Sequence, residues 1–389
     1  MNYENLSGNW NYPNAIRAGA GRISELAEAC RSLGMRAPLL ITDPGLAALP
    51  MVTEAVQQCN DAGLNCGLFS AIKGNPNGEN VMAGVAAYKK GAHDGVIAFG
   101  GGSGLDAAKA VALMAGQDRP LWDFEDVGDN WTRVNEAGVA PIVAVPTTAG
   151  TGSEVGRASV ITDDANHIKK IIFHPLMLPG VVILDPELTT GLPPTITAAT
   201  GMDALSHNLE ALCSPFYHPM AEGIAVEGIR LVQEYLPRAV RDGNDVEARM
   251  QMIVASAMGA TAFQKGLGGM HALAHPLGAL YDAHHGMLNA ILMPYVLKAN
   301  KAVIEARVCR LARYMDLPVT SFNGFLSWVL EMRQTLGIPH TLEEIGIDAC
   351  QAEKVGQMAT EDPSAGGNPI PFSAAQYSAI FTAAVNGTL

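Results

Sequence analysis

Apolar and polar residues alternate along the first half of the chain in blocks that predict strands between helices. Short runs without charged residues predict strands, because a strand buried on both faces carries apolar residues throughout. These runs lie at 37–42, 95–99, 141–145 and 181–184, with a shorter candidate at 67–69. The segment 21–34 before the first run and the segments 51–63 and 81–91 between later runs have helical spacing. Such alternation predicts a mostly parallel sheet with right-handed crossovers.

The pattern changes after Leu184-Asp185-Pro186. Strand-like runs disappear, and sequence rich in Ala, Leu and Met continues with helical spacing, broken by proline and glycine. We predict a loop at 360–371 and helices at 195–212, 219–235, 245–265, 287–300, 301–314, 321–336 and 373–386. The sequence therefore predicts two domains, an α/β domain at 1–186 and an all-helical domain at 187–389.

Composition narrows the class of protein. Hydrophobic residues make up 48% of the 389 residues and charged residues 16%, which supports large cores and argues against disorder. A net charge of -13 disfavours nucleic acid or an anionic membrane as a main partner. The six cysteines are scattered without a C-x-x-C motif, as in reduced proteins. Residues 1–4 do not open a signal peptide and no apolar run reaches membrane-spanning length, so we expect a cytoplasmic protein.

A glycine-rich loop, Gly100-Gly101-Gly102-Ser103-Gly104, follows the predicted strand at 95–99 and precedes a helical segment. Glycines let the backbone approach a phosphate, and a helix N-terminus offers unpaired N–H groups and a positive dipole end. Leu105 breaks the G-x-G-x-x-G fingerprint of dinucleotide-binding domains. Taken alone, the loop is equally well interpreted as a tight turn.

A second loop, residues 146–154, follows the buried strand predicted at 141–145 and is rich in threonine and glycine. This composition fits a loop that contacts a phosphate or a nicotinamide ribose, although a solvated loop is the alternative. Asp43, at the end of the first predicted strand, can accept hydrogen bonds from ribose hydroxyls. A carboxylate there would repel a 2′-phosphate, which favours NAD over NADP.

Histidines gather in the second half of the chain. Four of the ten lie within residues 269–289, among Gly, Ala, Leu and Met. Buried imidazoles need polar partners, and a divalent metal is a partner that several can share. Asp203 and His207 are four residues apart, which places both on one face of a helix. One carboxylate with several imidazoles suits iron(II), zinc or a similar ion.

The candidate ligands are Asp203, His207, His271 and one member of the doublet His284-His285. Each pair of residues four positions apart, taken alone, is more often a packing contact on a helix than a metal site. The metal hypothesis therefore depends on the presence of several such motifs in one helical domain. Spacing from His271 does not decide between the two members of the doublet. His275 precedes Pro276, which biases its backbone away from the helical region and would leave its side chain for another role.

These motifs together resemble the iron-containing (group III) alcohol dehydrogenases, and the resemblance runs from about Gly19 to the C-terminus. It implies an N-terminal Rossmann-like α/β domain and an all-α C-terminal metal-binding domain, the dehydroquinate synthase-like fold, with the active site in the cleft between them. The chain departs from the family pattern at Gly104, where proline is frequent, and at Ile370, where arginine commonly follows Asn-Pro.

The resemblance also implies roles for individual residues. It implies four metal ligands and chooses His285 over His284, because the last ligand of the family directly precedes glycine. It implies that His275 lies near the nicotinamide without being a ligand, and we expect His275 to act catalytically by relaying a proton to solvent. The implied ligands are Asp203, His207, His271 and His285, and the implied cofactor site is Asp43, Gly101, Gly102, Ser103, Asp106, Thr147, Thr148, Thr151 and Lys169, with Lys170 as the alternative lysine.

The resulting hypothesis is a metal-dependent, NAD-linked alcohol dehydrogenase or aldehyde reductase that acts on a small primary alcohol or diol. The metal is iron(II), with zinc or another divalent ion as the alternative, and the resemblance suggests a homodimer or larger homo-oligomer. Alternatives are a glycerol-dehydrogenase-like polyol oxidoreductase and an NAD- and metal-dependent lyase of the dehydroquinate synthase type. The lyase is disfavoured because the stretch 265–300 contains only Lys265 and Lys298 as cations for a phosphorylated substrate.

Overall fold

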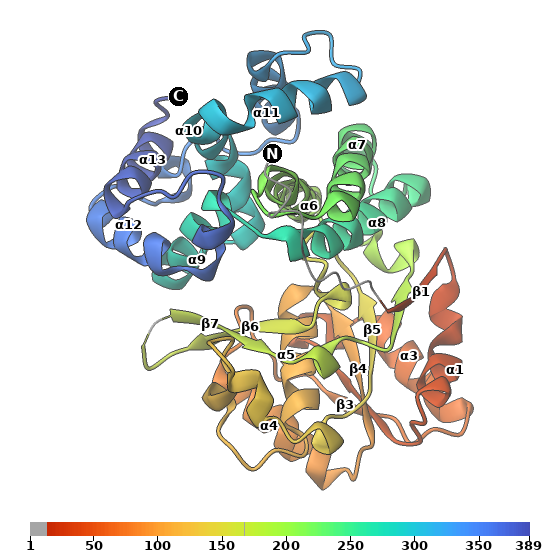
Figure 1. Cartoon of the computed structure of the whole chain (residues 1–389). Coiled ribbons are helices and arrows are strands. Elements are labelled where there is room, and N and C mark those ends of the chain that lie inside the picture. The colour runs from red at the N-terminus through yellow and green to blue at the C-terminus, as the bar shows by residue number, and fades with distance from the viewer. Residues whose placement is uncertain (1–13, 167) are drawn as a thin grey trace. The chain divides into compact units, whose positions relative to one another are not determined.

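The structure, a computed structural model, describes residues 14–166 and 168–389 and divides into two compact units (Figure 1). One unit ends at Gly191 and the other begins at Leu192. The boundary predicted at 186 falls at the start of the short 3-10 helix Pro186–Thr189. Residues 1–13, which include the start of the predicted first domain and the segment searched for a signal peptide, lie outside the described residues.

The first unit contains a six-stranded parallel sheet in the order β1-β8-β5-β4-β2-β3. Its strands are β1 (Ala15–Ala18), β2 (Pro38–Ile41), β3 (Gly67–Phe69), β4 (Gly95–Gly100), β5 (Ile142–Pro146) and β8 (Val181–Leu184). All five strands predicted from apolar runs are present, and the α/β fold class is confirmed. The edge strand β1 was not predicted, because three of its four residues are exposed and it carries no buried run.

Helices cover both faces of this sheet, as Figure 1 shows. Cys30 of α1 and Val52 of α3 share a buried core with alternate strand residues such as Leu40, Ile97 and Val143. The helices of this unit are α1 (Leu26–Ser32), α2 (Pro44–Ala47), α3 (Pro50–Asp61), α4 (Gly78–Lys90) and α5 (Gly102–Met114). Strands buried on both faces explain why their sequences lack polar alternation.

The direction of the strand order reverses between β2 and β4. From β2 the chain proceeds outward to β3, and from β4 it proceeds the other way to β5 and β8. In open parallel sheets, ligands bind at the carboxyl ends of the strands at such a switch point. Asp43 follows β2 and Gly101 follows β4, so both predicted cofactor residues lie at this edge.

An antiparallel hairpin of β6 (Ala158–Asp163) and β7 (Ile168–Phe173) lies apart from the main sheet. This hairpin was not predicted from the sequence. Buried and half-buried residues alternate along β6, so it lacks the continuous apolar run that identified the parallel strands. The hairpin contacts α5, which begins in the glycine-rich loop: the backbone N–H of Val160 in β6 donates to Asp106 of α5.

The second unit is helical in the residues that the structure describes, as predicted. Its long helix α6 packs against α7, α8 and α10, and nearly every side chain from Thr197 to Cys213 is buried. The helices are α6 (Pro194–Cys213), α7 (Pro219–Arg241), α8 (Val246–Ala262), α9 (Gly269–Tyr281), α10 (His285–Tyr314), α11 (Phe322–Thr335), α12 (Ala352–Glu361) and α13 (Ala374–Asn386). No helix among the described residues is both long enough and apolar enough to cross a membrane.

Three helical predictions need correction. The helices predicted at 287–300 and 301–314 are one continuous helix, α10. Helix α9 continues through Pro276, so the backbone of His275 is helical and the predicted deviation does not occur. Proline removes one helical hydrogen bond, and the packing of α9 against α10 and α12 compensates for that loss. Helix α12 was not predicted, although its buried residues Val355 and Ala359 are four positions apart.

Glu154 is a buried acid in the 3-10 helix Ser153–Val155, at the end of the threonine-rich loop 146–154. Its side-chain Oε1 has no hydrogen-bond partner among the described residues. Burial raises the pKa of Glu154 to about 7, against a weaker opposing effect of a backbone hydrogen bond and of Lys109. The folded protein therefore holds this proton more tightly than the unfolded chain does.

We expect Glu154→Gln to change how stability depends on pH. Because the pKa is raised on folding, the wild-type protein should lose up to about 3 kcal/mol of unfolding free energy as pH rises from 4.5 to 7. The Gln variant should be more stable than wild type at pH 8, and the difference should vanish near pH 4.5. Urea unfolding at both pH values measures this, with the exposed Glu54→Gln as control. Parallel pH profiles for wild type and Glu154→Gln would contradict the prediction.

Candidate functional site

One carboxylate and three imidazoles converge within the helical unit. Asp203 and His207 come from α6, His271 from α9 and His285 from the first position of α10. Each offers one potential ligand atom, and these atoms all lie within 4.8 Å of one another. Asp203, His207 and His271 are buried, whereas the side chain of His285 is 26% exposed. The four predicted ligand residues are thus brought together, with one partly open side at His285.

The break between α9 and α10 distinguishes the two adjacent histidines. Asp282 adopts a left-handed conformation with φ of 50° and ends α9. His284 is the N-cap of α10, where its Nδ1 accepts a hydrogen bond from Met287 N at 3.4 Å. His285 belongs to the convergent group. Helical spacing counted from His271 could not distinguish His284 from His285, because His271 and the two histidines belong to two separate helices or their caps.

The imidazole rings of the group lie close to one another. The rings of His207 and His271 stack at 4.7 Å, and those of His271 and His285 are 5.2 Å apart. Burial, assisted by the neighbouring His207, holds the pKa of His271 well below its usual range. A neutral imidazole presents a nitrogen lone pair, which is the form that binds a metal ion.

Asn289 contacts three members of the group at once. It lies on α10, four residues after His285, and its Nδ2 donates to Asp203 Oδ1 at 2.8 Å. The same nitrogen lies 3.2 Å from Nε2 of both His271 and His285. These three atoms therefore face one common point. Asn289 was not predicted from the sequence, although its spacing of four residues from His285 was the available signal.

Glu210 holds the ring of His271 from behind. Nδ1 of His271 donates to Glu210 Oε2 at 2.7 Å, which leaves Nε2 as the nitrogen directed at the group. Glu210 is buried, and burial raises its pKa to about 7, opposed by the backbone N–H groups that it accepts. It lies seven residues after Asp203 on α6, on the same helix face. That spacing was the signal that the sequence analysis did not use.

His275 lies beside the group with a carboxylate partner of its own. Its ring stacks on that of His285 at 5.4 Å, and its Nδ1 bonds to Asp362 Oδ2 at 2.8 Å. Burial raises the pKa of Asp362, but the neighbouring His275 and the hydrogen bonds from His275 and Ser364 together outweigh burial, so the net pKa is lowered. Asp362 falls in the segment predicted as a loop, where a lone acid gave no sign of a partner.

In the α/β unit, the glycine-rich loop meets the threonine loop. A side chain at Gly101 would place its Cβ 3.2 Å from Thr148, and one at Gly102 would lie 2.6 Å from Thr151. Thr147 N also donates to Gly100 O at 2.9 Å. The close approach of the two loops therefore excludes a side chain at Gly102 and leaves little room for one at Gly101. The structure brings together the predicted residues Gly101, Gly102, Ser103, Thr147, Thr148 and Thr151 at the end of β4 and β5.

Asp106 and Lys109 connect this helix to the second loop and to the hairpin. Asp106 accepts from Ser153 Oγ at 2.5 Å and from Val160 N at 3.0 Å. Lys109 is buried, lies 3.4 Å from Asp106 Oδ1 and donates to the backbone oxygen of Ser153 at 2.9 Å. Both carboxylate oxygens of Asp106, predicted as a cofactor ligand, are thus engaged by groups of the protein itself.

The remaining predicted cofactor residues have protein partners too. Asp43 caps α2, with its Oδ1 accepting from Leu46 N at 3.0 Å. Lys169 donates to Asn75 Oδ1 at 2.9 Å. Lys170 forms ion pairs with Glu125 and Asp163, each at 3.2 Å. Two carboxylates therefore hold Lys170.

Both halves of the chain match known protein families. Residues 13–186 match the family described as iron-containing alcohol dehydrogenase, and residues 197–385 match the C-terminal part of the Fe-containing alcohol dehydrogenase family. A 4-hydroxybutyrate dehydrogenase of Cupriavidus necator is 39% identical over 376 residues, which cover 94% of this chain and 97% of that protein.

Solved structures agree with this match. The crystal structure of a 1,3-propanediol oxidoreductase has a TM-score of 0.93 and 34% identity, and covers 97% of this chain and 100% of its own. The structure of a sulfoacetaldehyde reductase from Bifidobacterium kashiwanohense in complex with NAD+ has a TM-score of 0.88 and 28% identity, with 97% and 99% covered.

We expect Asp106→Asn to destabilise the α/β unit. An amide places an NH2 group against Val160 N–H or the Ser153 hydroxyl and removes the charge beside the buried Lys109. Loss of one partner in a buried, hydrogen-bonded pair should lower the free energy of unfolding by about 2–4 kcal/mol. Urea denaturation measures this, and the exposed Asp118→Asn is the matched control. Equal midpoints for the two variants would refute the connecting role of Asp106.

Proposed function

The chain belongs to the iron-containing alcohol dehydrogenase family and is therefore an oxidoreductase, and we propose that it interconverts a small primary alcohol or diol and its aldehyde with NAD+ and a divalent metal. The convergence of Asp203, His207, His271 and His285 carries this proposal. Their ligand atoms fall in one small volume, and three of the four residues are buried.

The donor set fits the proposed metal. One carboxylate and three imidazoles are oxygen and nitrogen donors that suit iron(II), with zinc as the alternative. The contacts of Asn289 support this fit, because atoms of Asp203, His271 and His285 already face one point. We propose that the substrate approaches the group from the side of His285, because the side chain of His285 is partly exposed. Asp203, His207, His271 and His285 would hold the ion.

When bound, a divalent metal polarises the substrate oxygen as a Lewis acid, and NAD+ accepts the hydride. We propose that His275 moves the hydroxyl proton toward solvent, since an imidazole titrates in the required range. Asp362 bonds Nδ1 of His275, which assigns this task to Nε2. The ring of His275 stacks on that of His285, so it lies at the partly exposed side of the group.

The cofactor site that we propose lies at the carboxyl ends of β2, β4 and β5. Gly101 is the N-cap of α5 without a side-chain cap, so the N–H groups of Gly102 and Ser103 can bind a pyrophosphate. Thr147, Thr148 and Thr151 would line the site, and Asp106 would support it through Ser153. Asp43 would bind the adenosine ribose and disfavour NADP. Lys169 is the proposed lysine, because Lys170 already pairs with two carboxylates.

The matched proteins support a small substrate with a primary alcohol. Their names include 1,3-propanediol oxidoreductase and 4-hydroxybutyrate dehydrogenase, whose substrates share that group. Family membership favours this reaction over the polyol oxidoreductase and the lyase. We also propose that the protein is cytoplasmic, because its six cysteines are free. We further propose that it forms a homo-oligomer, and light scattering would measure the size of the assembly.

The activity test is NADH formation by protein that has been stripped of metal and reloaded anaerobically with Fe(II), with a Zn(II)-loaded control. The panel contains short primary alcohols, 1,3-propanediol, glycerol and 4-hydroxybutyrate. We expect metal-dependent turnover of a primary alcohol or diol with NAD+ and little with NADP+. Failure of every alcohol with either metal, in protein that still binds NAD+, would count against the proposed reaction.

We expect His271→Ala to lose bound metal and activity together, because it removes the most deeply buried imidazole of the group. Activity should fall by about a hundredfold or more, as when a metal site loses a direct ligand. Elemental analysis and NADH formation measure the two losses, and the exposed His340→Ala is the matched control. Full activity in a metal-free His271→Ala protein would contradict a metal-dependent mechanism.

A further inference from the structure

The helix that carries His271 begins without a capping side chain of its own. The N-cap of α9 is Gly268 and the next residue is Gly269, so neither supplies an oxygen for the N–H groups of the first turn. Side chains from other segments bind these groups instead. Glu210 of α6 accepts from Gly268 N at 2.7 Å and from Met270 N at 2.6 Å. Asn368 Oδ1 accepts from Gly269 N at 3.0 Å.

The same carboxylate that caps α9 also bonds His271. Glu210 Oε2 accepts both from Gly268 N and from His271 Nδ1, each at 2.7 Å. The start of the helix and the ring of its histidine are therefore held by one group. Any displacement of Glu210 would shift the helix and rotate the imidazole at the same time.

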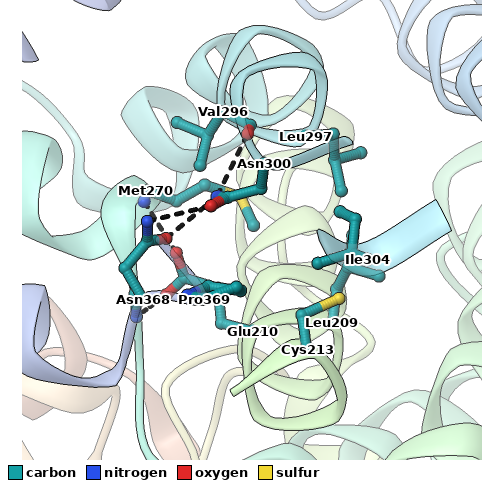
Figure 2. A pocket seen from close by; sticks show the side chains of 11 residues that line it. Leu209, Glu210, Cys213, Met270, Val296, Leu297, Asn300, Ile304, Asn368 and Pro369 are labelled. Carbon is teal, nitrogen blue, oxygen red and sulfur yellow. Dashed lines mark hydrogen bonds between the residues drawn. The ribbon is translucent and has the colours of Figure 1, made fainter. Parts of the chain in front are cut away.

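Asn368 is itself held in place by Asn300 of α10, as Figure 2 shows. Asn300 Nδ2 donates to Asn368 Oδ1 at 2.9 Å, and Asn368 Nδ2 donates back to Asn300 Oδ1 at 3.0 Å. The two asparagines line a small pocket whose other lining residues include the apolar side chains of Leu209, Cys213, Val296, Leu297 and Ile304. An apolar wall reduces competition from water, which strengthens the hydrogen bonds beside it.

The two glycines permit this arrangement. A Cβ at Gly268 would lie 3.1 Å from both Asn368 Oδ1 and Glu210 Oε1, and one at Gly269 would lie 3.2 Å from Asn368 Oδ1. Larger residues would push the capping side chains away from the helix. With glycine at 268 and 269, α9 has no capping side chain at its own N-terminus. Its cap is supplied instead by Glu210 of α6 and by Asn368, which precedes α13.

We propose that Glu210 and Asn368 are positioning residues that act as a shared N-cap for α9 and thereby set the orientation of His271 toward the metal. This inference rests on the proposed metal site and adds residues outside the ligand set. It predicts that metal affinity depends on the capping of α9, whereas a residue that only stabilises the fold would change the melting temperature and leave metal affinity unaltered.

The test is metal affinity in Glu210→Gln. An amide keeps one acceptor oxygen and turns an NH2 group toward donors, so it cannot accept from Gly268, Met270 and His271 together. We expect the Kd for Zn(II), measured by chelator competition on metal-stripped full-length protein, to rise about 10–100-fold. The absorption spectrum of the Co(II)-loaded variant should also change. Asp245→Asn, the same change at the N-cap of α8, is the matched control and should keep the wild-type Kd.

Asn368→Ala provides an independent arm and should raise the Kd about tenfold. Its control, Ser321→Ala, removes the cap of α11 and should lower the melting temperature without altering metal affinity. Wild-type Kd in both Glu210→Gln and Asn368→Ala would overturn the inference. If Glu210→Gln does not fold, an unchanged Kd in Asn368→Ala overturns it alone. A wild-type protein that binds neither Zn(II) nor Co(II) would instead contradict the proposed function.

Discussion

The hydrogen bond between Glu210 and His271 is the interaction on which the arrangement of the candidate metal ligands depends. It joins α6, which carries Asp203 and His207, to α9, which carries His271 and His275. Buried carboxylates and imidazoles are costly without partners, so helices that bring them together must also satisfy their second polar atoms. Glu210 does this for His271, Asp362 does it for His275, and Asn289 bonds Asp203.

The α/β unit obeys a comparable constraint with different groups. A buried ammonium, Lys109, donates to three backbone oxygens, of Ser153, Gly156 and Ala158, and lies beside Asp106. These bonds attach the threonine loop and the hairpin to α5. The glycines at 101 and 102 then allow that loop to approach the helix N-terminus. In both units, a glycine pair at a helix start permits a side chain from elsewhere to come close.

Much of the fold could be predicted from local patterns. The parallel strands are buried on both faces, so each appears as an uncharged run. The features that were missed are those without such a pattern. β1 is a short exposed edge, and the alternation in β6 has no apolar run. In α9, tertiary packing overrides the preference of His275, the residue before proline, for a non-helical backbone. In α10, the helix continues through residues 300–301, where a boundary between two helices was predicted.

The sequence by itself determined the composition of the site: a carboxylate and an imidazole at helical spacing, a histidine-rich segment and two loops of glycine and hydroxyl residues. Helical spacing left His284 and His285 undecided and the family resemblance favoured His285. Only the tertiary structure showed that His285 joins the group and that Glu210, Asn289, Asp362 and Asn368 hold it. The reason is physical. Helical periodicity determines which residues share a face of one helix, but contacts between α6, α9, α10 and the segment before α13 depend on packing over long sequence separations.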